Sequence, residues 1–84
     1  MKTRTQRETE ARRIANGPYL ACPADLVIYG ERPARIYRVR GFGVYVYATA
    51  GTLTKADVVK QIADEIDQIE RYGEPLNGAG GAGE

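Results

Sequence analysis

The clearest pattern of hydrophobic and polar positions lies in the last third of the chain. An apolar residue recurs there at i, i+4, i+8 and i+11, a spacing that places all of them on one stripe of an α-helix. Thr54 and Asp57 have the spacing of a capping box, and Gly73 supplies a C-terminal stop. The pattern therefore predicts an amphipathic helix over residues 54–72. Its stripe consists of Val58, Ile62, Ile66 and Ile69.

Two strand-like runs, residues 35–40 and 44–48, stand on either side of a glycine-containing turn in the middle of the chain. They are rich in β-branched and aromatic residues, which suit a half-buried pleated surface. A two-residue loop of Gly41 and Phe42 would be a type II′ turn, because glycine supplies the positive φ that the first central position needs. We therefore predict a β-hairpin with this turn.

The predicted turn sets the register of the hairpin. On one face it pairs Val39 with Val44, Tyr37 with Val46 and Arg35 with Ala48. On the other face it pairs Arg38 with Tyr45 and Ile36 with Tyr47, and it places Arg40 beside Gly43. A three-residue loop would instead put Arg38 and Arg40 among the valines, because a one-residue slip moves every side chain to the opposite face. The two-residue loop is therefore the better prediction.

The remaining segments predict the rest of an α+β domain. Residues 26–29 form a short apolar run that predicts a strand before the hairpin. Residues 5–16 indicate a short helix that begins with a capping box of Thr5 and Glu8. We therefore predict the order α-β-β-β-α, in which a three-stranded antiparallel β-meander packs on the C-terminal α-helix and a short N-terminal helix lies beside them.

The apolar face of this meander is expected to pack on the helix of residues 54–72. It consists of Leu26, Ile28, Tyr37, Val39, Val44, Val46 and Ala48. The opposite face carries arginine and tyrosine, and the sequence leaves open whether the thin helix of residues 5–16 covers it. Residues 1–73 are predicted to form this single α+β domain. Residues 74–84 are predicted to be a flexible, glycine-rich tail with nothing to pack against.

Composition places the chain among ordinary globular domains. Of its 84 residues, 43% are hydrophobic and 27% are charged. The net charge of +1 is unevenly distributed, with +5 over residues 1–50 and −4 over residues 51–84. Cys22 is the single cysteine and the N-terminus lacks the apolar segment of a secretory signal, so we predict a cytoplasmic protein. No stretch has the apolar length of a membrane span, so no membrane partner is expected.

The residue types present argue against catalysis. The chain has no histidine, which removes the Ser-His relay and the usual Cys/His zinc site. Asp64, Glu65 and Asp67 are helical neighbours without a visible pocket, and Cys22 has no assignable basic partner. We therefore predict that the protein is not an enzyme and uses neither a cofactor nor a metal.

The arginine–tyrosine side of the sheet is the main candidate contact surface, because these residue types are enriched at the hot spots of protein interfaces. The predicted partner-binding residues are Tyr29, Arg38, Arg40, Tyr45 and Tyr47. A secondary, acidic face on the C-terminal helix comprises Asp64, Glu65, Asp67 and Glu70. The expected function is a small protein-binding module whose partner is a host protein or protein complex. Phage and mobile-element accessory proteins, including anti-CRISPR inhibitors of host systems, are commonly domains of this kind.

A second interpretation is nucleic-acid binding by the same face and the basic N-terminal helix, with arginines on phosphates or bases and tyrosines stacking. Residues 40–47 resemble the RNP1 octamer of RNA-recognition motifs. They match it at Arg40, Gly41, Phe42, Gly43 and Tyr47, and depart from it at Val44 and Tyr45. The chain has no room for the helix between the first two strands of that family, so we interpret the octamer mainly as a turn. Homodimerisation through the tyrosine face is a third possibility.

Overall fold

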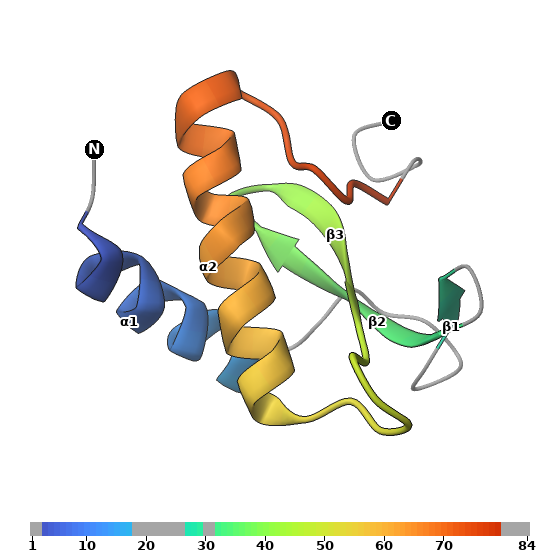
Figure 1. Cartoon of the computed structure of the whole chain (residues 1–84). Coiled ribbons are helices and arrows are strands. Elements are labelled where there is room, and N and C mark those ends of the chain that lie inside the picture. The colour runs from blue at the N-terminus through green and yellow to red at the C-terminus, as the bar shows by residue number, and fades with distance from the viewer. Residues whose placement is uncertain (1–2, 18–26, 30–31, 80–84) are drawn as a thin grey trace.

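The computed structural model describes residues 3–17, 27–29 and 32–79. Its helices are α1 (Arg4–Asn16) and α2 (Lys55–Tyr72), and its strands are β1 (Val27–Tyr29), β2 (Arg32–Val39) and β3 (Phe42–Tyr47). β2 pairs antiparallel with β3, and the short β1 pairs antiparallel with β2. Both helices lie on one side of the sheet (Figure 1). The prediction of an α+β fold with two helices and an antiparallel sheet is confirmed.

α2 begins and ends where its sequence pattern predicts. The Thr54 hydroxyl accepts a hydrogen bond from the Asp57 N–H at 3.1 Å, and the Asp57 carboxylate accepts one from the Thr54 N–H at 3.1 Å. These bonds satisfy donors at the first turn that have no partner within the helix. Gly73 ends the helix in the left-handed conformation, with a φ of 78°, and its N–H donates to the Ile69 carbonyl at 2.8 Å. The predicted capping box and stop are both confirmed.

α1 begins with a different capping box from the predicted pair of Thr5 and Glu8. Thr3 is the N-cap, and its hydroxyl accepts a hydrogen bond from the Gln6 N–H at 3.2 Å. The Gln6 side chain accepts one from the Thr3 N–H at 2.9 Å. Both pairs have the spacing of a capping box, so the sequence offered two solutions. The earlier cap leaves Glu8 on the helix surface, where it pairs with Arg4.

The turn between β2 and β3 consists of Arg40 and Gly41, one residue earlier than predicted. Their φ angles are 52° and 88°, and a positive φ at both central residues is the mark of a type I′ turn. The predicted pairing is therefore wrong by two residues. The observed register pairs Val39 with Phe42, Tyr37 with Val44, Ile36 with Tyr45 and Arg35 with Val46. Because side chains alternate with a period of two, this shift leaves each strand residue on its predicted face.

One apolar core lies between the sheet and the two helices. Its buried members are Tyr37, Val39, Val44 and Val46 from the strands, Val58, Ile62 and Ile66 from α2, and Ala11 from α1. Since Ala11 belongs to the same cluster as the strand valines, α1 packs beside α2 on the apolar side of the sheet. It does not cover the arginine–tyrosine side. The predictions for Cys22, Leu26 and the side chain of Ile28 lie outside the described part of the chain.

The chain returns to the sheet after α2 (Figure 1). Residues 76–79, here termed the strap, run antiparallel to the edge of β3. The Tyr45 N–H donates to the Asn77 carbonyl at 2.9 Å, and the Ala79 N–H donates to the Gly43 carbonyl at 2.8 Å. The prediction that the tail has nothing to pack against is corrected by this pairing for residues 76–79. Main-chain atoms make these bonds to β3, so the bonds themselves leave no side-chain pattern in the sequence.

Acid should weaken the start of α2 through Asp57. Hydrogen bonds from the Thr49 hydroxyl, and next from the Thr54 N–H, hold the pKa of Asp57 below its ordinary value. Because folding lowers this pKa, the stabilisation is complete above the unfolded-state value and is lost as the pH falls through the folded-state value. Between about pH 4 and pH 2, the unfolding free energy should therefore fall more steeply in the wild type than in Asp57→Asn.

Urea titrations across this pH range measure the two slopes. Asp64→Asn replaces an exposed acid on the same helix, and it should keep the wild-type slope. A wild-type slope in Asp57→Asn would contradict the assignment of this stabilisation to the capping box.

Candidate functional site

The arginine–tyrosine side of the sheet, here termed the outer face, is formed by alternate residues of two strands. It comprises Arg32, Ala34, Ile36 and Arg38 of β2 and Gly43, Tyr45 and Tyr47 of β3. Arg38 is exposed, whereas Ile36 and Tyr45, which stand opposite each other, are half-buried. Both helices pack on the other side of the sheet, so neither covers this face (Figure 1). The outer face therefore offers apolar and cationic groups side by side.

Tyr47 is fixed by contacts to both its backbone and its ring. Its N–H donates to the side-chain carbonyl of Gln61 at 3.1 Å, and its carbonyl accepts from the Gln61 amide at 2.7 Å. The Arg32 guanidinium lies 5.2 Å from the centre of the Tyr47 ring, within the range of a cation–π contact. Ala34, opposite Tyr47, is fully buried. The groups that a partner could reach here are therefore the exposed guanidinium of Arg32 and part of the Tyr47 ring, whose orientation is fixed.

Three of the five predicted partner-binding residues, Arg38, Tyr45 and Tyr47, come together on the outer face. The register also places Tyr29 opposite Arg32, but the side chain of Tyr29 lies outside the described part of the chain. Arg32 was missed because the predicted strand began only at residue 35, whereas β2 begins at Arg32. Its even spacing from Ile36 and Arg38 could have revealed it, because residues two apart on a strand share a face.

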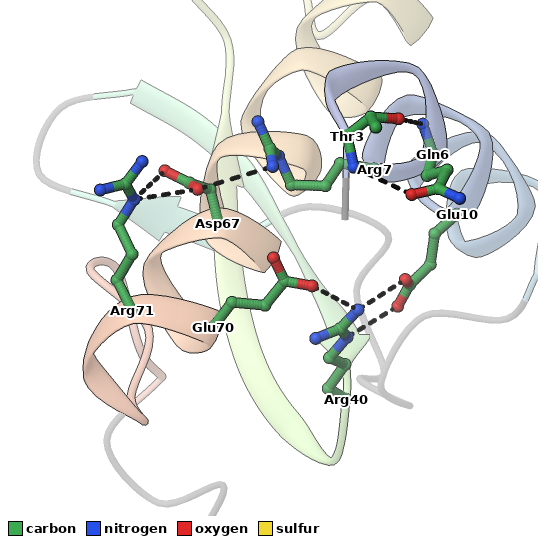
Figure 2. Close-up of polar contacts among 8 residues, drawn as sticks. All are labelled: Thr3, Gln6, Arg7, Glu10, Arg40, Asp67, Glu70 and Arg71. Carbon is green, nitrogen blue, oxygen red and sulfur yellow. Dashed lines mark hydrogen bonds and ion pairs between the residues drawn. The ribbon is translucent and has the colours of Figure 1, made fainter. Parts of the chain in front are cut away.

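Arg40, the fourth described residue of the predicted set, joins the hairpin turn to both helices (Figure 2). Its Nε and Nη2 donate to the two carboxylate oxygens of Glu10 at 3.0 and 2.9 Å, and Nη2 lies 3.1 Å from Glu70 Oε2. The hydrogen bond to Glu10 raises the pKa of Arg40 above its ordinary value, against a smaller opposing effect of burial. Arg40 therefore belongs to the junction of turn and helices, and its predicted place on the outer face is corrected.

The acidic residues predicted to share one face of α2 have separate surroundings. Glu65 is buried, with 2% of the residue exposed, and its carboxylate accepts hydrogen bonds from the strap. Glu70 contacts Arg40, and Asp67 pairs with a guanidinium of α1 at 3.7 Å. Asp64, whose side chain is 71% exposed, is the most solvated of the four and pairs with Lys60 on the helix surface. These residues therefore do not form one continuous acidic surface.

The place of Glu65 could have been recognised from the sequence. It stands three residues after Ile62 and four before Ile69, which puts it inside the apolar stripe. An acid within such a stripe indicates a buried hydrogen-bond partner, because a buried charge is costly without one.

A groove of about 710 Å³ runs between α1 and α2. Its rim carries the cations Arg4, Arg7, Arg12, Lys55 and Lys60 and the acids Glu8, Asp64 and Asp67. Ion pairs join Glu8 to Arg4 and to Arg12, and Lys60 to Asp64. Because carboxylates are interleaved with the cations, the groove is not a uniformly basic track of the kind that follows a phosphate backbone.

Within the described residues, no group of three or more His, Cys, Asp or Glu is arranged to hold a metal ion. In the same part of the chain, no helix has the length and apolar character needed to cross a membrane. Comparison of the chain with protein-family models, curated proteins and solved structures finds no significant match. The functional interpretation therefore depends on the geometry of the outer face.

Replacing Arg40 should destabilise the fold through its two carboxylate partners. Arg40→Asn introduces no new backbone strain, because asparagine suits the positive φ of the turn, and any relief of strain there makes the measured loss a lower bound on the contribution of the ion pairs. The largely buried carboxylates of Glu10 and Glu70 then lose their shared cation, at a cost of about 1.5 kcal/mol in unfolding free energy. Arg40→Lys should recover part of the loss, since an ammonium cannot make the bidentate bond.

Arg38→Asn is the matched control, because Arg38 is an exposed arginine two residues earlier in the chain. It should change the unfolding free energy by less than about 0.5 kcal/mol. Urea unfolding measures both variants, and equal losses would show that the junction at Arg40 contributes nothing specific.

Proposed function

We propose that the chain is a small non-enzymatic protein-binding module that contacts its partner through the outer face. The supporting observation is a side of the sheet that neither helix covers, where exposed Arg32 and Arg38 stand beside half-buried Tyr45 and Tyr47. Tyrosine and arginine carry a large share of the binding energy at protein interfaces. Their grouping on one face that neither helix covers is the feature that most favours this function.

The order already present in the outer face supports the proposal. Gln61 holds the backbone of Tyr47, and Arg32 lies over its ring, so these groups lose little further freedom when a partner binds. The strands also rest on the packed core between sheet and helices, which gives the face a firm backing. A partner would therefore meet a contact surface that needs little reorganisation.

The chemistry of the face indicates what would bind it. Two exposed arginines flank partly exposed Ile36 and tyrosine rings, so a complementary surface would place carboxylates around an apolar centre. We propose a host protein or protein complex of the cytoplasm as the partner, in the manner of a phage or mobile-element inhibitor of anti-CRISPR type.

The proposal takes the sheet as a three-stranded meander in α-β-β-β-α order. The pairing of Val27 with Ala34 supports it and would extend the face towards Tyr29.

Truncating the two rings should strongly reduce partner recovery. The double variant Tyr45→Ala/Tyr47→Ala, used as a tagged full-length bait, should recover its partner at least about tenfold less than the wild type, because hot-spot truncations cost more than 1 kcal/mol each. The control, Lys60→Ala/Asp64→Ala, removes an exposed ion pair on α2 and should bind as the wild type does. Equal recovery by a folded double variant would eliminate the outer face as the contact surface.

Nucleic-acid binding is the second candidate, because Arg32 and Arg38 could contact phosphates while Tyr45 and Tyr47 stack on bases. It ranks second because the net charge is +1 and because the cations of α1 are interleaved with acids. Gel shifts of the full chain with single-stranded RNA at about 50 and 200 mM salt test it, since phosphate contacts are strongest at low salt. A complex that weakens with salt and is lost in Arg32→Glu/Arg38→Glu would favour it. Absence of binding at the lower salt would eliminate it.

A further inference from the structure

Glu65 is a buried carboxylate that is satisfied by the backbone of the strap. Its Oε1 accepts a hydrogen bond from the Leu76 N–H at 2.7 Å, and its Oε2 accepts one from the Asn77 N–H at 2.8 Å. Because 2% of the residue is exposed, water cannot readily replace these donors. The position of Glu65 therefore requires a chain segment that presents two adjacent N–H groups.

The edge of β3 provides the second half of the same site. The Tyr45 N–H donates to the Asn77 carbonyl, one residue after Leu76, and the Gly43 carbonyl accepts from the Ala79 N–H, three residues after Leu76. Leu76 directs no buried side chain into the protein, since 72% of the residue is exposed. The four hydrogen bonds to Glu65 and β3 all involve main-chain atoms of the strap, as in peptides that add a strand to a sheet edge.

We propose that Glu65 and the edge of β3 form a strand-binding site whose occupant is the strap, taken from the same chain in the monomer and from a second copy in an exchanged dimer. A second copy is the occupant to which the proposal commits, because it carries the same segment and its strap can make every one of the observed bonds without any change in the site. Residues 73–75 link α2 to the strap, so exchange requires the chain to reopen only at this short connection.

The covalent link between the strap and its own chain sets the balance between the monomer and the exchanged dimer. A strap attached to its own chain has an effective concentration in the millimolar range, so the same-chain state dominates in dilute solution. Exchange increases as the chain concentration approaches that value. The site lies at the edge of the sheet and does not use the side chains of the outer face, so this inference is independent of the proposed function.

Two full-length variants separate the site from its occupant. The acceptor, Asn77→Pro/Ala79→Pro, keeps the site but removes one N–H that donates to Glu65 and one that donates to Gly43. The donor, Glu65→Leu, keeps the strap but replaces the carboxylate with an apolar side chain that suits the stripe of α2. In a mixture, the intact strap of the donor should displace the acceptor's own strap, which keeps only the bonds of its Leu76 N–H and of the carbonyl at position 77.

Sedimentation equilibrium at millimolar chain concentration measures the result. Each variant alone should sediment as a 9.2 kDa monomer, and an equimolar mixture should approach twice that mass. The control mixture pairs the acceptor with Glu65→Leu/Asn77→Pro/Ala79→Pro, which offers no strap, and it should remain monomeric. Far-UV circular dichroism checks that each chain keeps its helices, and Glu65→Ala replaces Glu65→Leu if that donor does not fold.

The masses of the two mixtures decide whether the proposal stands. A doubled mass in the first mixture and a monomer in the control establish that the site accepts a strap from a second copy. A monomer in both mixtures, with folded chains, overturns the proposal. A doubled mass in both also overturns it, because association then does not involve the strap.

Discussion

The turn at Arg40 and Gly41 is the constraint on which the arrangement of the protein depends. By reversing the chain directly after Val39, it sets the register that turns the strand valines towards the helices and the tyrosines away from them. A non-glycine residue at positive φ costs on the order of 1 kcal/mol. The contacts of the Arg40 side chain with Glu10 and Glu70 offset this cost and hold α1 and α2 against the same end of the hairpin.

The uneven charge along the sequence is matched within the fold. Basic residues from the first half of the chain meet acids of α2, as Arg7 does with Asp67 and Arg40 with Glu70. A carboxylate of α2 that seemed directed at an external partner thus serves an internal contact instead. The charge separation along the chain therefore indicates which elements pack together. Because these basic residues already pair with acids inside the fold, the separation gives little support for a nucleic-acid partner.

The sequence predicted best those features whose signals are local. The caps and stripe of α2 lie within one segment, and the alternation of Arg38, Tyr45 and Tyr47 sufficed to place them on one face. The turn was missed because the side chain that stabilises it bonds to Glu10, 30 residues away along the chain. The strap was missed for another reason. Main-chain bonds leave no mark in the side-chain pattern, although Glu65 within the apolar stripe was an available sign.

The placement of the tyrosines gives the protein its own optical reporter. The chain has six tyrosines and no tryptophan, so tyrosine dominates its near-ultraviolet absorption and emission. Tyr37 is enclosed in the core, whereas Tyr45 and Tyr47 are partly accessible on the outer face. A molecule that settles on that face comes directly against two of the chain's chromophores, while the ring in the core supplies a shielded reference. Occupancy of the outer face can therefore be followed spectroscopically without attaching any label.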